Sequence, residues 1–178
     1  MRSILARIVV VMGVLIVAAG CGSHDDQNAP LGSALFDPCK DIRDSAFTKA
    51  GFDPATKGHP VAEFPDRCTV SSSGGPGLIL EHYANQGAAP TFDRELARQQ
   101  SVPGNHVKQV SVNGRDAFTA PQVLGVFGST ASMGCDVNLR TKLGMLRIND
   151  SATSSSSDGC TEALAAATIL EPAIGPDR

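Results

Sequence analysis

Five cysteine side chains are the groups of this 178-residue chain whose type and spacing could do chemistry: Cys21, Cys39, Cys68, Cys135 and Cys160. A cysteine thiolate acts as a nucleophile, forms disulfides or ligates a metal ion. No two of these residues form a Cys-x-x-Cys pair, and no histidine lies at ligand spacing from them, which counts against a zinc site. We therefore predict no bound metal and no other cofactor, which leaves acylation and disulfide pairing.

The first twenty residues have the layout of an export signal. Arg2 and Arg7 give a positively charged start, residues 8–20 carry no charge, and small residues fill the last three positions. A membrane-spanning helix needs roughly 20 apolar residues, so this run is short for a permanent anchor. We expect residues 1–20 to be a signal peptide that is removed on export.

Cys21 directly follows this signal. The sequence Ala18-Ala19-Gly20-Cys21 resembles the bacterial lipobox at its last three positions, with alanine at the first position where leucine is usual. The resemblance implies that the thiol of Cys21 receives a diacylglyceryl group, and two or more acyl chains such as palmitate make membrane attachment stable. The alternative is an ordinary secretory signal with a chance cysteine after the cut. We predict a lipoprotein anchored through Cys21 on the extracytoplasmic face of the cell membrane.

The mature chain is acidic and begins with a polar segment. Removal of the signal leaves thirteen basic and eighteen acidic residues, a formal net charge of −5. The basic residues are scattered singly, which counts against nucleic acid as a partner. Residues 21–35 contain glycine and proline and lack an apolar period, so we expect a flexible tether there.

The other four cysteines form an even set, as expected for disulfides in an oxidising compartment. Four cysteines allow three pairings. Chain entropy gives about 3.5 kcal/mol for each of the short loops 39–68 and 135–160 and only about 1 kcal/mol more per bridge for the nested alternatives, which does not decide between them. We favour Cys39–Cys68 with Cys135–Cys160 because thiols that are nearer in the chain meet more often during folding.

The elements that must position these cysteines include helices at both ends of the folded part. Three helices are predicted, over residues 37–51, 91–100 and 160–170, and an ordered loop with three prolines over residues 53–65. Asp37 and Thr91 are typical N-cap residues, and Pro172 is typical of a helix end. Small residues in the last helix, among them Ala163 and Ala167, would let it approach a sheet closely.

Short extended segments separated by turn residues predict strands in three pairs: 67–73 with 78–84, 106–112 with 115–121, and 134–141 with 144–150. Asn113-Gly114 joins the second pair and suits a tight type I′ turn. This order of elements predicts an α+β fold, with a mainly antiparallel sheet of about five to seven strands, three packed helices and disulfide staples. We expect one domain over residues 36–172 and a tail over residues 173–178.

Catalytic motifs are missing from the sequence, which has no Gly-x-Ser-x-Gly, no His-Glu-x-x-His and no phosphate-binding loop. His59, His82 and His106 fall in separate elements. Glu81 and His82 are neighbours on a strand and should face opposite sides of it. We predict a protein that is not an enzyme and assign no catalytic residue; the alternative is a cell-envelope hydrolase whose site is assembled only in space.

Two segments are candidate contact surfaces. They are residues 53–65 and the glycine-rich residues 121–134, in which Val123, Leu124, Val126 and Phe127 are either exposed for contact or part of a core strand. We expect a binding or scaffolding domain for a small apolar ligand or an envelope protein. The sequence assigns no binding residue and leaves the oligomeric state open.

Short motifs distributed along the chain resemble one family. They are Asp-Pro-Cys at 37–39, Ala-Gly at 50–51, the strand that opens at Cys68, Val-x-Gly-x-x-Ala at 112–117, Cys-x-Val at 135–137 and Cys-x-x-Ala at 160–163. In this order they are similar to the motifs of an actinobacterial lipoprotein family, the domain of unknown function 3558. The resemblance implies an envelope lipoprotein and supplies no established activity.

Overall fold

A computed structural model of the chain describes residues 36–60, 66–72, 75–84, 89–126, 129–150 and 160–175, without the side chains of residues 75–76, 123–126 and 129–133. The predicted signal peptide and tether lie outside the described residues, as do residues 151–159.

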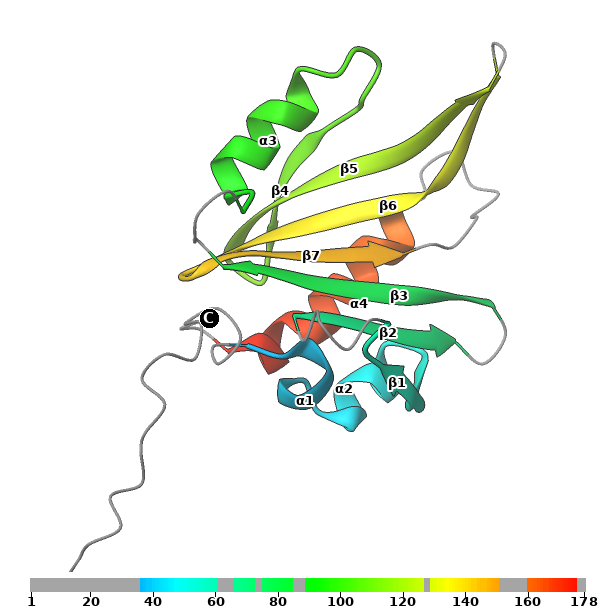
Figure 1. Cartoon of the computed structure of the whole chain (residues 1–178), viewed down its shortest axis with the longest axis vertical. Helices are drawn as coiled ribbons and strands as arrows, with labels where there is room; N and C mark the ends of the chain where they lie inside the picture. The colour runs from blue at the N-terminus through cyan, green and yellow to red at the C-terminus, as the bar shows by residue number, and fades with distance from the viewer. Residues whose placement is uncertain are drawn as a thin grey trace, which may run out of the picture.

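Seven strands form one antiparallel sheet in the order β1-β2-β3-β7-β6-β5-β4 (Figure 1). The strands are β1 (Phe52–Gly58), β2 (Arg67–Ser72), β3 (Gly75–Ala84), β4 (Lys108–Val112), β5 (Arg115–Val126), β6 (Ser129–Thr141) and β7 (Gly144–Asp150). All three predicted strand pairs are present as antiparallel neighbours. Asn113 and Gly114 both have positive φ, 51° and 90°, as the predicted tight turn requires.

The described helices number four, one more than predicted, and are α1 (Pro38–Asp41), α2 (Asp44–Lys49), α3 (Phe92–Gln100) and α4 (Cys160–Ile174). In Figure 1 α4 runs behind the central strands, α1 and α2 lie near β1 and β2, and α3 lies near β4 and β5. The α+β class with a mainly antiparallel, disulfide-stapled sheet is confirmed at this level.

The predicted first helix is wrong in its continuity. Asp37 caps α1 as expected, because its carboxylate accepts a hydrogen bond from the backbone N–H of Cys39. The helix then stops at Ile42, whose backbone is extended. In a continuous helix Ile42 and Phe47 would point about 140° apart. The break allows both side chains to be fully buried in the core.

The predicted loop over residues 53–65 is also corrected in its first half, where β1 forms the edge of the sheet. Pro54 cannot donate to a ladder, and an edge strand with an irregular register is where a sheet tolerates proline. The register of β1 against β2 shifts between Asp53 and Gly58. Residues 61–65 lie outside the described part of the chain.

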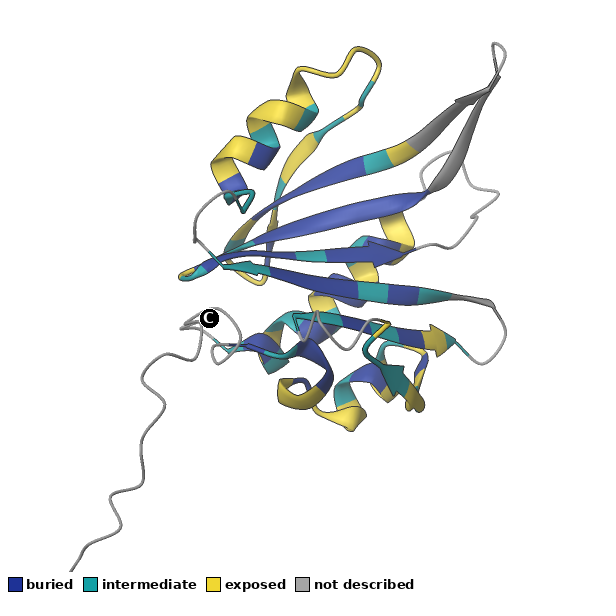
Figure 2. Cartoon of the chain, in the orientation of Figure 1, coloured by how far each residue is buried: buried dark blue, intermediate teal, exposed yellow. Residues whose placement is uncertain are grey.

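The main core lies between the sheet and α4. Alternate strand residues point into it, and they include Cys68, Val70, Leu78, Leu80, Val137, Leu139, Leu146 and Ile148. Helix α4 contributes Ala163, Ala166, Ala167 and Leu170, so small side chains allow the close approach that the sequence predicted. Figure 2 shows buried residues concentrated in the central strands.

Helix α4 does not end before Pro172 but continues to Ile174, which is buried. Proline lacks an N–H, so the carbonyl of Thr168, four residues earlier, has no donor within the helix. Asn113 fills this role from the β4–β5 turn, because its Nδ2 donates to Thr168 O at 2.9 Å. The side chain of a predicted turn residue therefore supports the helix beyond the proline.

A second, smaller apolar cluster lies on the opposite face of the sheet and fixes α3. Phe92 of α3 packs edge-on against Phe118 of β5 with ring centroids 5.2 Å apart, beside Ala120 and Met145. The predicted cap Thr91 accepts a hydrogen bond from Arg94 N at 3.3 Å. Helix α3 thus covers one part of this face.

Candidate functional site

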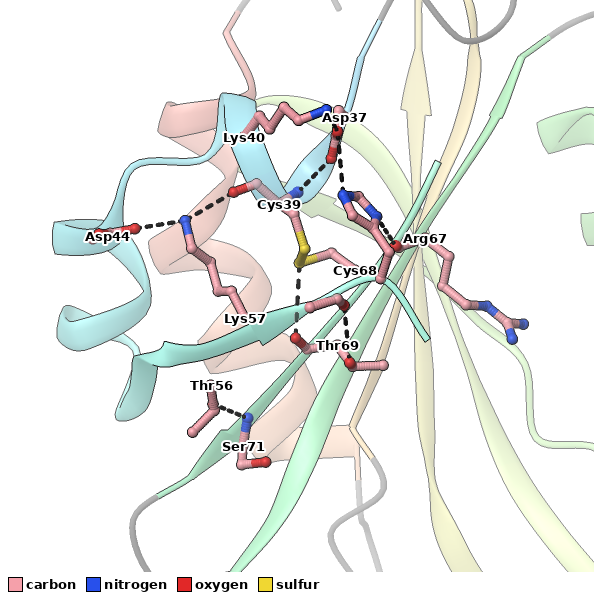
Figure 3. Close-up of a disulfide and its surroundings, with 12 residues drawn as sticks. Asp37, Cys39, Lys40, Asp44, Thr56, Lys57, Arg67, Cys68, Thr69 and Ser71 are labelled. Atoms are coloured by element: carbon pink, nitrogen blue, oxygen red, sulfur yellow. Dashed lines mark hydrogen bonds and ion pairs between the residues drawn. A yellow bond between two sulfur atoms is a disulfide. The ribbon is translucent and has the colours of Figure 1, made fainter. Parts of the chain in front are cut away.

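Both disulfides join the pairs favoured from the sequence. Cys39 and Cys68 are bonded at 2.07 Å between sulfurs, and Cys135 and Cys160 at 2.03 Å. The first bridge joins α1 to β2 (Figure 3), and the second joins β6 to the first residue of α4. Cys21, the predicted lipidation residue, lies outside the described residues.

Three potential metal ligands lie together, but each has a structural partner. The ligand atoms of Asp37, Cys39 and His59 are within 4.8 Å of one another. The sulfur of Cys39 belongs to a disulfide and is not a thiolate, and Asp37 pairs with Lys40 at 2.9 Å (Figure 3). His59 lies 3.4 Å from Asp37 through Nε2, and its Nδ1 donates to the carbonyl of Arg67 at 2.8 Å. These contacts connect α1 to the sheet.

The other two histidines of the folded part occupy different environments. His82 is buried and packs edge-on against Phe36 at 5.4 Å between ring centroids, whereas His106 is exposed. Glu81 and His82 face opposite sides of the sheet, as the strand pattern predicted.

The segment 121–134, a candidate contact surface, continues β5 and β6. Val123, Leu124 and Val126 pair through their backbones with Ser132, Ala131 and Ser129. The backbone of these three residues therefore forms strand, as one of the two alternatives from the sequence predicted. Their side chains, and the whole of Phe127, lie outside what the structure describes.

Polar side chains occupy the sheet face opposite α4, across the central strands. Glu81 of β3 lies opposite Arg147 of β7, which in turn lies opposite Asn138 of β6. In the neighbouring row Asn149 of β7 lies opposite Asp136 of β6. Glu81, Asn138 and Asp136 are only 6%, 1% and 4% exposed. We call these five residues the polar face, and their burial distinguishes it from an ordinary solvated sheet face.

A groove of about 630 Å³ lies beside the polar face. Its lining comes from the end of α3, from the loop that follows it and from β5, β6 and β7. Six polar side chains line it: Arg98, Gln99, Asn105, Gln122, Asp136 and Arg147. Because this lining includes α3, we call it the α3 groove; a volume of this size suits a small organic molecule.

Glu81 is the centre of an ion cluster that lies next to the α3 groove. One carboxylate oxygen pairs with Arg67 and the other with Arg147, and Tyr83 Oη donates to Glu81 Oε2 at 2.7 Å. The Arg147 guanidinium lies 5.3 Å from the Tyr83 ring centroid. Burial raises the pKa of Tyr83 to about 12, although the charge of Arg67 acts in the opposite direction. The cluster also borders a second cavity of about 370 Å³, to which Asp66 contributes.

Asp136 forms the acidic part of the α3 groove. Asn149 Nδ2 donates to its Oδ1 at 2.7 Å, and Gln122 Nε2 lies 3.2 and 3.3 Å from its two oxygens. Burial raises the pKa of Asp136 above its usual range. The two amide donors and the charge of Arg98 oppose this shift, and the charge of Glu95 adds to it. The carboxylate is therefore oriented by neutral groups in a site where charge is costly.

The raised pKa of Asp136 predicts how its substitution by asparagine changes stability with pH. An acid whose pKa is higher in the folded state than in the unfolded state stabilises the fold as the pH falls from above that value toward its ordinary value of 3.8. Wild type should therefore gain free energy of unfolding relative to Asp136→Asn on acidification, as measured by urea unfolding between pH 8 and pH 4.

Asp93 supplies the control of opposite sign. A hydrogen bond from Arg140 lowers the pKa of Asp93, so any stability that this contact adds is present at neutral pH and is lost on acidification. Wild type should thus lose, not gain, relative to Asp93→Asn as the pH falls. The same direction for both variants would contradict the burial of Asp136.

One arginine of the sheet holds α3 in place, and a second arginine forms an ion pair within α3. Arg140 of β6 donates to both carboxylate oxygens of Asp93, at 3.0 and 2.6 Å, and its guanidinium lies 4.1 Å from the Phe92 ring centroid. On α3 itself, Arg98 binds both oxygens of Glu95, at 2.8 and 2.5 Å, and lowers the pKa of that carboxyl. Arg98 therefore reaches the α3 groove with its charge already matched.

The polar face and the α3 groove were not predicted from the sequence. The alternation of Cys135, Val137 and Leu139 with Asp136 and Asn138 was visible in β6, but such a pattern usually indicates one buried and one solvated face. No described helix is long and apolar enough to cross a membrane. Comparison of the chain with models of protein families, with curated proteins and with solved structures finds no match.

Proposed function

We propose that this chain is an exported lipoprotein, anchored to the cell membrane through Cys21, whose folded domain binds a small polar ligand in the α3 groove. The observation that carries the binding proposal is the buried polar lining of that groove. Asp136 and Arg147 are placed there by neighbouring strands. Burying such groups costs free energy unless they are matched, and functional sites are where proteins accept this cost.

Export and anchoring are supported by the amino-terminal pattern together with the disulfides. Two bridges use all four cysteines of the folded domain, as expected in an oxidising compartment. Cys21 is then the fifth cysteine, and acylation gives it a chemical role. The resemblance to the domain of unknown function 3558 supports the same location.

The groove favours a polar ligand over the apolar one expected from the sequence. Its lining combines charged and amide groups with a few aliphatic side chains. Among the described residues Val102, 43% exposed, is the exposed large hydrophobic side chain, so a partner that docks on an extensive apolar patch is less favoured. The alternative of an envelope hydrolase gains no support from the groove, because its described lining includes no histidine. That alternative stays a prediction.

Replacement of Cys21 by alanine tests the anchor. We expect wild-type protein in the membrane fraction, with an intact mass that starts at Cys21 and includes a diacylglyceryl group. Reduction should add four hydrogens, for two bridges. Cys21→Ala should lose the lipid mass and leave the membrane while retaining the four-hydrogen shift, which serves as the internal control for folding. An unmodified Cys21 in wild type would contradict the anchor.

A further inference from the structure

Each arginine that lines the α3 groove is paired with a carboxylate, whereas Asp136 has no direct ion pair among the described residues. Arg98 is paired with Glu95, and Arg147 is paired with Glu81. In the part of the chain that the structure describes, Asp136 has hydrogen bonds to two amides and no ion pair with a lysine, arginine or histidine. Buried charges in proteins are normally paired with a charge of opposite sign. This carboxylate therefore lacks a direct counter-ion among the described residues.

Unmatched hydrogen-bonding atoms lie beside Asp136. Asn138, two residues along β6 on the same face and 1% exposed, has no hydrogen-bond partner for Oδ1 or Nδ2 among the described residues. Asn105 lines the groove, and its buried Oδ1 likewise lacks a donor there. Native structures contain few such atoms, and each calls for a partner. The groove therefore presents the carboxylate of Asp136 to whatever occupies it, with the buried amide oxygen of Asn105 in its wall.

The rest of the lining indicates which kind of cationic ligand group would fit beside Asp136. Val102, Pro103, Ala120 and Pro121 provide short aliphatic surface, and no aromatic residue is in the described lining. A quaternary ammonium is bound best by aromatic faces and donates no hydrogen bond. A primary ammonium has three donors and no acceptor, which matches a carboxylate beside an amide oxygen.

We propose that the α3 groove binds a small aliphatic compound through a primary ammonium group, with Asp136 as its counter-ion. This inference rests on the proposed function of the groove and adds the chemical class of the ligand. Arg98 and Arg147 each contact a carboxylate, Glu95 and Glu81, which reduces their repulsion of the cation, although Glu81 is shared with Arg67. Gln122 and Asn149 act as positioning residues that hold the carboxylate.

The test is a titration of the isotope-labelled mature lipoprotein in detergent micelles with n-butylammonium chloride, followed by backbone amide NMR shifts. We expect saturable shifts at Asn105, Ala120, Asp136 and Arg147. Three probes of matched size or charge accompany it: n-butanol, sodium butanoate and tetramethylammonium chloride. Each should bind at least about tenfold more weakly, the difference expected for one charged hydrogen-bonded contact.

Two variants assign the effect to Asp136. Asp136→Asn keeps the shape and should weaken n-butylammonium binding at least about tenfold. Asp66→Asn removes an acid that lines the neighbouring cavity instead, and should change the affinity less than twofold. Equal weakening by both variants, or none by Asp136→Asn, would overturn the proposal in favour of a general effect of charge or of binding elsewhere.

A pH titration of the wild-type protein keeps the test valid if Asp136→Asn does not fold. The charged and titratable groups that face Asp136 are Glu95 and Arg98 of α3, Tyr83 of β3 and the Arg147–Glu81 pair. Hydrogen bonds from Arg98 lower the pKa of Glu95, whereas burial raises the pKa of Asp136. Affinity for n-butylammonium should therefore fall on acidification as Asp136 protonates. Constant affinity between pH 8 and pH 4 would overturn the role of Asp136.

The outcomes separate the two proposals. Saturable binding of butanol or butanoate in the groove without binding of n-butylammonium would overturn the ammonium inference and leave the binding function supported. Saturation by none of the four probes would overturn both.

Discussion

Loss of the Cys135–Cys160 disulfide is expected to lower the free energy of unfolding by about 3.5 kcal/mol, from the chain entropy of the closed loop. The sequence separation is 25 residues. For a domain of this size, that change corresponds to a fall in melting temperature of about 10 °C. The double variant Cys135→Ala/Cys160→Ala should show it in thermal unfolding followed by circular dichroism. Alanine is chosen because a serine hydroxyl at the buried position 135 would add an unsatisfied polar group.

The Cys39–Cys68 bridge provides a matched comparison for this entropic mechanism. Cys39–Cys68 closes a loop of similar length, with a sequence separation of 29, so the entropic effect on the unfolded chain is nearly equal. The native contacts differ, because α1 ends at the fully buried Ile42, whereas α4 packs largely through alanines. Equal losses from the two double variants would support the entropic account. A much larger loss of unfolding free energy for Cys135→Ala/Cys160→Ala would show that its bridge acts mainly on the native packing of α4.

Local sequence signals predicted most of the fold because they depend on neighbouring residues. The Asn113-Gly114 turn, the Thr91 cap and the alternation in β2, β3 and β6 each have a local physical cause, and each is present in the structure. The favoured disulfide pairing followed from proximity in the chain and is also confirmed.

The corrected elements are those in which tertiary contacts outweigh local preference. The first helix breaks at Ile42 because the core requires both Ile42 and Phe47. Helix α4 passes Pro172 because Asn113, distant in sequence, bonds the carbonyl that the proline leaves free. Neither contact could be inferred from a window of neighbouring residues.

The candidate site was missed for a related reason. Glu81 and Arg147 are 66 residues apart in sequence, and only the pairing of β3 with β7 brings them together. Polar residues at alternate strand positions, such as Asp136 and Asn138, normally indicate a solvated face. Their burial depends on α3 and its following loop, whose placement on this face no sequence pattern specified.

The other large effect on the free energy of unfolding is expected when Glu81, in the ion cluster at the edge of the α3 groove, loses its charge. Glu81→Gln keeps the size of the side chain but removes the one charge that Arg67 and Arg147 share. Breaking a buried ion pair by removing one partner costs about 3–5 kcal/mol, because the remaining charge is left without compensation. Arg67 is 41% exposed and can be stabilised by water, so we expect the lower part of this range, about 3 kcal/mol.

Two further variants show whether the cost of Glu81→Gln comes from the stranded charge of Arg147. Arg67→Gln removes the more exposed arginine and leaves the pair of Glu81 with Arg147, so it should cost about 1 kcal/mol or less. Arg147→Met, added to Glu81→Gln, replaces the stranded cation by an apolar side chain of similar length. The double variant should therefore be more stable than Glu81→Gln alone in urea unfolding at pH 7. If it is less stable, Arg147 contributes mainly through its packing over Tyr83, and the electrostatic account of the cluster fails.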